Sequence, residues 1–304
     1  MLYFVVRRLG ETLVTLLLVT MIVFCLARLT GDPTPLLLAP EATEEMRQAF
    51  REYYALDRSV FEQYAIFIAD VANGQFGESF RFKEPAIDIA LQAVGPTLKL
   101  TAVAMALSIA VGLPLGLAAA ASRNETVKEF VNGLASLGQA MPAFWVGLML
   151  VSLLALEFGL LPTSGYGAPR HYVLPALTLS IPTGAAIAGL TLANVEEALK
   201  SDFIRMERVL GLSAPRIVLK HALRNASLPI VTYLGLQFGL ILSGAIVTER
   251  IFAWPGIGQR VVEAILNRDY PVVQAIVVLT AFLFMMINLL VDLVYLILDP
   301  RLRK

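Results

Sequence analysis

The sequence predicts an all-α integral membrane protein with six transmembrane helices. Of its 304 residues, 57% are hydrophobic and only 16% are charged, whereas soluble domains average about 25% charged residues. Six stretches are long and apolar enough to cross a hydrocarbon core of about 30 Å as helices of about 20 residues. No segment shows the alternating pattern of a membrane β-barrel strand. The composition therefore excludes an ordinary soluble domain and a disordered chain.

Charged or proline- and glycine-containing segments separate the apolar stretches. The first stretch follows Arg7-Arg8 and is longer than the apolar core of a signal peptide, so we retain it as a true span. Pro114, Pro142 and Pro182 fall inside spans and predict kinks. The predicted spans are, in chain order, Leu9–Leu29, Thr97–Ala121, Gly133–Leu156, Leu174–Val195, Ile230–Val247 and Val272–Leu298.

A long acidic segment, Gly31–Pro96, follows the first span. It has 66 residues, of which 11 are acidic and 5 basic, for a net charge of −6. Its periodicity predicts short amphipathic helices over Glu41–Tyr54 and Ser59–Val71. The glycine- and phenylalanine-rich stretch Asn73–Lys83 is predicted to be irregular. We accordingly divide the chain into an N-terminal span with a large outer loop, 1–96, and a five-span core, 97–304.

The distribution of lysine and arginine predicts the orientation of the chain in the membrane. Cytoplasmic loops of membrane proteins carry an excess of these residues. With the N-terminus inside, the inner segments hold 13 of them and the two short outer loops hold four, Arg170, Arg250, Arg260 and Arg268. Both termini are therefore predicted to be cytoplasmic, and Gly31–Pro96 to be outside.

The residues needed for catalysis or for cofactor binding are missing. The chain has no Gly-x-x-x-x-Gly-Lys-Ser/Thr motif for a nucleotide phosphate. Cys25 is the single cysteine, and His171 and His221 are predicted to lie on opposite faces of the membrane. The 24 basic and 24 acidic residues cancel, which argues against a nucleic-acid binder. We predict no catalytic residue, no metal site and no cofactor in this chain.

The cytoplasmic segment at about 196–229 is the most informative one. Its helical periodicity is broken at Gly211, and a second helix is expected from an N-cap at Ser213 with Pro215 in its first turn. A helix–turn–helix of this size is larger than a linker needs, and one apolar stripe runs along it. We interpret it as a docking element; a helix pair lying on the membrane surface is the alternative.

Short motifs along the whole chain follow one another in a recognisable order. They are Arg7-Arg8-Leu9, Gly31-Asp32-Pro33, Gly74–Ser79, Pro96-Thr97-Leu98, Lys220–Ala226 with Pro229, Glu249–Gly258, Arg268–Pro271, Asn288–Asp292 and Asp299-Pro300-Arg301. With these motifs and the helix–turn–helix, the chain resembles the permease subunits of ABC importers, in the class that transports dipeptides, oligopeptides, glutathione and nickel. The run Met206–Leu210 departs from the family, whose members usually carry smaller residues there, in a Thr-Ala-Arg-Ala-Lys-Gly-like run.

The resemblance implies a type I ABC-importer permease fold in a bacterial or archaeal cytoplasmic (inner) membrane. It implies a pore-forming subunit that imports peptides or peptide-like solutes and is not itself an enzyme. The implied partners are a second homologous permease, two cytoplasmic ATPase subunits that hold the ATP and Mg²⁺, and an extracytoplasmic solute-binding protein. The residues expected to couple the permease to the ATPases are Asp202, Phe203, Arg205, Glu207, Arg208, Gly211, Leu212 and Ser213.

Uncharged polar residues within the spans are the candidates for the transport pathway. Such groups are costly in lipid unless they find partners or water. These pathway candidates are Gln139, Thr178, Ser180, Thr183, Asn194, Gln237 and Ser243. Hydrogen bonding between helices is the alternative role for each of them.

A secondary carrier or channel that does not use ATP is the alternative function. Such a protein would be expected to carry charges at mid-membrane, and Glu11, Glu157 and Asp292 lie nearer the ends of their spans. The sequence leaves the substrate and the partner permease open.

Overall fold

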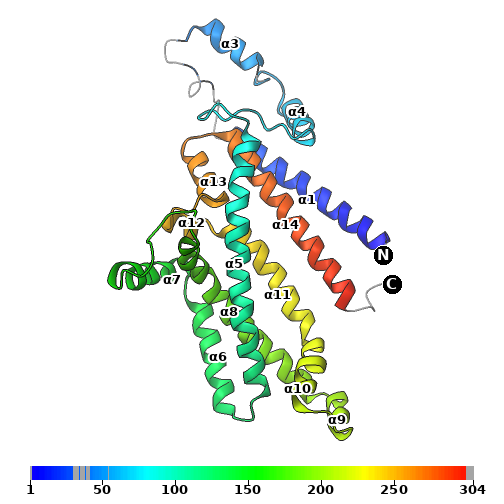
Figure 1. Ribbon diagram of the computed structural model, residues 1–304. Coiled ribbons are helices and arrows are strands. Elements are labelled where there is room, and N and C mark those ends of the chain that lie inside the picture. The colour runs from blue at the N-terminus through cyan, green and yellow to red at the C-terminus, as the bar shows by residue number, and fades with distance from the viewer. Residues whose placement is uncertain (1, 30–33, 35–37, 39–41, 54, 299–304) are drawn as a thin grey trace. The chain divides into compact units, whose positions relative to one another are not determined.

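The computed structural model describes residues 2–29, 34, 38, 42–53 and 55–298 (Figure 1). Within these residues the regular structure is helical, apart from an isolated bridge between Glu78 and Pro85. The chain forms two compact units, Gly95–Gln259 with Phe284–Lys304 and Leu2–Val94 with Arg260–Leu283. The motifs Gly31-Asp32-Pro33 and Asp299-Pro300-Arg301 lie outside the described residues.

The helices differ in length from the predicted spans. In chain order they are α1 (Leu2–Leu29), α3 (Glu44–Tyr53), α4 (Val60–Ala72), α5 (Ala86–Ala121), α6 (Glu125–Ala140), α7 (Ala143–Leu150), the π-helix η1 (Val151–Glu157), α8 (Pro169–Lys200), α9 (Asp202–Val209), α10 (Ala214–Arg216), the π-helix η2 (Ile217–Ala222), α11 (Leu223–Gly244), α12 (Ile246–Ile251), α13 (Ile257–Leu266) and α14 (Tyr270–Leu298). Five helices, α1, α5, α8, α11 and α14, are longer than the predicted spans to which they correspond, and the others are shorter.

The all-α membrane architecture is confirmed. Within the described residues, five helical segments are long and apolar enough to cross a membrane, and a bent helix pair raises the number to six. The predicted third span, Gly133–Leu156, is wrong as a single helix: α6 and the helix Ala143–Glu157 meet at an angle of 95°. Pro142 causes the break because it has no N–H to donate and forces the preceding Met141 into extended backbone, φ −77° and ψ 123°.

The predicted fifth span also needs correction. It was expected to begin at Ile230, separate from the second helix of the cytoplasmic segment, but helix continues from Ala214 through η2 and α11 to Gly244. Pro229 lies inside this run and does not end it. The span and the segment before it therefore form one continuous helical run.

The two short helices predicted in the outer segment are confirmed as α3 and α4. Ser59 caps α4: its hydroxyl accepts from the Glu62 N–H, and the Glu62 carboxylate accepts from the Ser59 N–H. The Thr20 hydroxyl of α1 contacts the Tyr64 hydroxyl of α4 at 3.1 Å. Asn73–Lys83 is irregular, as predicted.

Glycines allow the membrane helices of the larger unit to approach closely. A Cβ at Gly112 of α5 would overlap the Gly184 carbonyl oxygen of α8, and one at Gly235 of α11 would overlap the Val291 side chain of α14. Gly116 and Gly239 are equally restricted. The small residues therefore set the distances between helices.

A buried carboxylate, Glu249, joins several segments at one end of this unit. Glu249 is fully buried; its Oε1 accepts from the Thr97 hydroxyl at 2.6 Å and its Oε2 from the Gln259 N–H at 3.0 Å. Thr97 in turn accepts from the Ile257 N–H at 2.9 Å, and a Cβ at Gly256 would overlap the carboxylate. Burial raises the pKa of Glu249, which lies beyond the end of the membrane span, and its hydrogen bonds oppose that shift.

A second buried carboxylate organises the smaller unit. Asp269 accepts from the Ser79 hydroxyl and from the Phe80 N–H, the latter at 3.1 Å, and the Ser79 hydroxyl accepts from the Phe82 N–H. Ser79 and Asp269 are both buried. Two motifs about 190 residues apart in the sequence, Gly74–Ser79 and Arg268–Pro271, therefore meet through one carboxylate.

We predict that Gly112→Ala destabilises the protein and that Gly133→Ala does not. The added methyl group at Gly112 meets a backbone carbonyl that cannot turn away, whereas nothing lies within 4 Å of a Cβ at Gly133. Alanine also stabilises a helix by about 1 kcal/mol relative to glycine, so the control variant Gly133→Ala should be slightly more stable than the parent. Thermal unfolding in detergent checks this; equal midpoints for the two variants would contradict close packing at Gly112.

We also predict that Glu249→Gln removes a pH dependence of stability. Because the folded pKa is raised, the unfolded chain ionises first, and stability falls as pH increases above the ordinary value of 4.5. Glutamine does not ionise, and its single side-chain oxygen can accept only one of the two hydrogen bonds in the same way. The variant should therefore be less stable than the parent at low pH, and its melting temperature relative to the parent should rise over this range. Glu249→Leu loses both contacts and should be less stable at every pH, by about 1–3 kcal/mol. Parallel pH profiles for parent and glutamine variant would refute the assignment.

Candidate functional site

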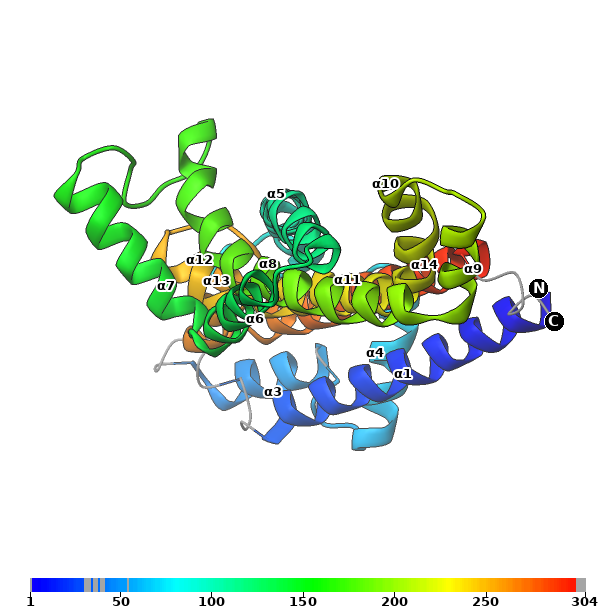
Figure 2. The same ribbon diagram turned by 90° about the horizontal axis from the view of Figure 1, so that it is seen from below.

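The predicted coupling segment forms a compact helix–turn–helix. Helices α9 and α10 follow the C-terminal end of α8, and α9 packs against η2 (Figures 1 and 2). Gly211 makes the turn with φ +79°. The Leu212 N–H donates to the Glu207 carbonyl at 3.2 Å and the Gly211 N–H to the Arg208 carbonyl at 3.1 Å. This pattern is a Schellman motif, which uses glycine because a left-handed backbone is cheap only without a Cβ.

Apolar side chains fix this turn to the core of the unit. Ile204 of α9 is fully buried, Ile217 of η2 is 3% exposed, and both pack in a cluster that includes Val195 of α8. Leu212 packs against the same cluster. Ser213 occupies the predicted N-cap position, without a hydrogen bond from its side chain, and Pro215 lies in the first turn of α10. The helix–turn–helix is therefore a packed element rather than a solvated loop.

The outer face of the turn combines charges with exposed apolar side chains. Among the predicted coupling residues, the structure exposes Asp202, Phe203, Arg205, Arg208, Gly211 and Ser213 and leaves Glu207 and Leu212 half-buried. Asp202 and Arg205 form an exposed ion pair at 3.4 Å. The sequence reasoning missed an apolar edge formed by Met206, Val209 and Leu210, which are 66%, 87% and 69% exposed. The sequence signal for this edge was the size of its side chains, because the run Met206–Leu210 is bulkier than the run expected from the resemblance.

The structure also pairs two residues that the sequence reasoning did not connect. The Glu207 Oε1 of α9 lies 2.7 Å from the His221 Nδ1 of η2, and the two side chains are only 18% and 25% exposed. The π-helical turn contributes to this placement: the Leu223 N–H bonds to the Val218 carbonyl, five residues back, which rotates the helix face relative to an α-helix.

The pathway candidates fall into two groups. Thr178, Ser180 and Thr183 of α8 are buried within the chain, and their hydroxyls donate to carbonyls three or four residues earlier in the same helix. Three amides are more open: Gln139 is exposed, and Asn194 and Gln237 are half-buried. Each amide donates one hydrogen bond, Gln139 to the Ala135 carbonyl, Asn194 to the Leu190 carbonyl and Gln237 to the Tyr233 hydroxyl. The Ser243 side chain lies outside the described residues.

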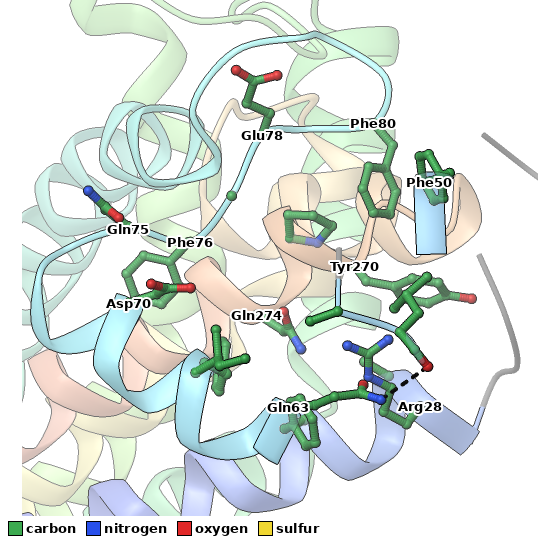
Figure 3. A pocket seen from close by; sticks show the side chains of 18 residues that line it. Arg28, Phe50, Gln63, Asp70, Gln75, Phe76, Glu78, Phe80, Tyr270 and Gln274 are labelled. Carbon is green, nitrogen blue, oxygen red and sulfur yellow. Dashed lines mark hydrogen bonds between the residues drawn. The ribbon is translucent and has the colours of Figure 1, made fainter. Parts of the chain in front are cut away.

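A cavity of about 190 Å³ lies within the smaller unit (Figure 3). Residues of α1, α4 and α14 and of the segment 75–80 line it, among them Arg28, Gln63, Tyr270 and Gln274. Gln63 donates to the Leu56 and Arg58 carbonyls, while its Oε1 is buried without a hydrogen-bond partner among the described residues. The eighteen lining residues include none of the predicted coupling or pathway residues.

Comparisons with known proteins agree with this geometry. The chain is 38% identical to the glutathione transport system permease protein GsiC of Escherichia coli over 304 residues, which is 100% of this chain and 99% of that protein. The protein of the same name from Shigella dysenteriae gives the same values. The inward-facing MetNI methionine ABC transporter matches 69% of this chain and 96% of its own, with a TM-score of 0.60 and 17% identity, which shows a shared fold.

Family models identify the chain along its length. Residues 112–304 match the binding-protein-dependent transport system inner membrane component, and residues 1–101 match the N-terminal region of such components. The family carries no ATPase of its own, and this agrees with the absence of a phosphate-binding motif in the sequence. The chain belongs to the binding-protein-dependent transport system inner membrane component family and is a permease subunit of an ATP-driven ABC importer.

Proposed function

We propose that the turn formed by α9, Gly211 and α10 is the coupling loop through which the ATPase partners drive this permease. The observation that carries the proposal is the division of the turn into two faces. Ile204 and Ile217 bind it to the core, while the apolar edge Met206, Val209 and Leu210 is left exposed beside charged side chains. An exposed apolar patch rimmed by charges is typical of a protein interface. Asp202, Phe203, Arg205 and Arg208 are placed to contact the ATPase.

The membership of the family implies an ATPase partner and a solute-binding protein. We extend this to two ATPase subunits, which hold ATP and Mg²⁺, and to a second homologous permease that completes the pore. The exposed apolar side chains of α6 and α7 support a helix partner as well as lipid, for example Phe130, Phe144 and Trp145. This chain requires no cofactor of its own in the proposal.

We propose peptides or peptide-like solutes as the substrate class. The relatives named above transport glutathione, a peptide, and the uncharged amides Gln139, Asn194 and Gln237 keep exposed surface in this chain. Each amide nitrogen and oxygen has further hydrogen-bonding capacity. A neutral polar lining can pass a zwitterionic solute without trapping it by charge. The buried hydroxyls of Thr178, Ser180 and Thr183 already bond within α8, so the amides are the stronger pathway candidates.

The chain is a multi-pass inner-membrane protein, and we propose that both termini and Ser213 face the cytoplasm while the segment from 31 to 96 faces outward. We predict that cysteine at Asp57, in a Cys25→Ala background, reacts with a membrane-impermeant thiol reagent on intact cells and that cysteine at Ser213 does not. Both positions are exposed, whereas Ser79 is buried and would report poorly. The opposite labelling pattern would reverse the proposed orientation.

We predict that Gly211→Val lowers ATP-driven uptake by the reconstituted importer while the protein still inserts. Valine at φ +79° is strained by about 1–3 kcal/mol, and nothing lies within 4 Å of a Cβ there, so the effect is conformational rather than steric. Gly211→Asn is the matched control, because asparagine tolerates a left-handed backbone. Uptake and ATP hydrolysis are measured together; parental uptake by the valine variant would rule out the coupling role.

A further inference from the structure

Glu207 and His221 join the two halves of the turn. Glu207 lies in α9 and His221 in η2, at the start of the long helix that continues into the fifth span, and Glu207 Oε1 lies 2.7 Å from His221 Nδ1. The fully buried Ile204 and Ala222 lie within three residues of Glu207 and one residue of His221. The contact therefore sits beside the apolar core and ties the exposed helix to a transmembrane helix.

Stability alone gives little reason for this pair. Besides the 2.7 Å contact, the Glu207 Oε2 and the His221 Nε2 are buried and have no hydrogen-bond partner among the described residues. Removing polar groups from water without full compensation costs free energy, so a partly satisfied pair is no more stabilising than apolar residues of similar size. The pair instead fixes the orientation of α9 relative to η2, because a charge-assisted hydrogen bond holds its partners in one geometry.

The other charged side chains of α9, those of Asp202, Arg205 and Arg208, are exposed. Asp202 and Arg205 pair with each other within the helix, at 96% and 72% exposure. The apolar edge is close to Glu207 in the chain: Met206 and Val209 belong to α9, and Leu210 is its C-cap. Fixing Glu207 fixes the direction in which that edge is presented.

We infer that Glu207 and His221 are positioning residues: their contact locks α9 to the base of the fifth span, so that a push on the apolar edge by the ATPase moves the span. The inference rests on the proposed coupling function. In this arrangement Glu207 faces the core and holds α9 in place, whereas the exposed residues of α9 contact the ATPase. Without the Glu207–His221 contact, α9 can rotate when the ATPase pushes on it, and ATP is hydrolysed without movement of solute.

The test uses the complete importer reconstituted with its ATPases and binding protein. We measure solute imported per ATP hydrolysed for Glu207→Ala, for the apolar double variant E207A/H221L and for the exchange E207H/H221E. Loss of one charge-assisted hydrogen bond should lower this ratio about tenfold in Glu207→Ala. The apolar double variant should recover the melting temperature of the parent but keep the low ratio, and the exchange should restore the ratio. Glu197→Gln, an exposed carboxylate of α8, is the control and should match the parent.

Two results would overturn the inference: a parental ratio in Glu207→Ala, or recovery of the ratio by the apolar double variant along with its stability. If Glu207→Ala fails to assemble, Glu207→Gln gives the same comparison. We expect a smaller decrease in solute imported per ATP for this variant, and no decrease would contradict the positioning role. Gly211→Val separates this inference from the proposed function. If Gly211→Val imports less solute per ATP and Glu207→Ala imports as much as the parent, only the positioning role of Glu207 and His221 is rejected. If both variants import as much solute per ATP as the parent, the coupling loop itself is rejected.

Discussion

One end of the permease core depends on a single buried group, the carboxyl group of Glu249. Both of its oxygens accept hydrogen bonds, one from Thr97 at the start of the second span and one from the backbone after α12. Trp254 closes the same region by donating from its indole nitrogen to the Pro96 carbonyl at 3.1 Å. A buried carboxylate must be fully bonded, so it permits only one arrangement of these segments. The Glu249 carboxyl group occupies the space that a side chain at position 256 would need, so glycine is required there.

The proposed coupling turn, formed by α9, Gly211 and α10, is packed onto the core of the same unit. Ile204 and Ile217 seat the turn on a cluster that also contains residues of α8 and α11, such as Val195 and Ala226. The helix after the turn runs into the fifth span without interruption. A displacement of the turn therefore reaches two transmembrane helices through packed side chains, and packed interiors move as units because they have little free volume.

Composition and periodicity were sufficient to predict the helical membrane class, the two helices of the outer segment and the turn at Gly211, because each depends on local rules. They were not sufficient where the outcome depends on a neighbour. The Pro142 kink was predicted, but its 95° magnitude was not. His221 was considered for a catalytic or metal site and rejected, and was otherwise named only within the motif Lys220–Ala226. Nothing in the sequence places it opposite Glu207 or predicts the π-helical turn that orients it. Val209 and Leu210 were interpreted from the sequence only as a departure from the family pattern, and the exposed apolar surface that they form was not predicted.

The break at Pro142 has a consequence for how the protein enters the membrane. Helix α6 has 16 residues and the helix Ala143–Glu157 has 15, so neither reaches the length of about 20 that a helix needs to cross alone. Helix α8 begins at Pro169, and Gly138 and Gly189 allow α6 and α8 to pack closely against each other. The insertion machinery therefore meets two segments that are each shorter than a full span and that pack against a helix synthesised later. We expect this region to integrate as a helical hairpin, after α8 has left the ribosome, and not helix by helix in chain order.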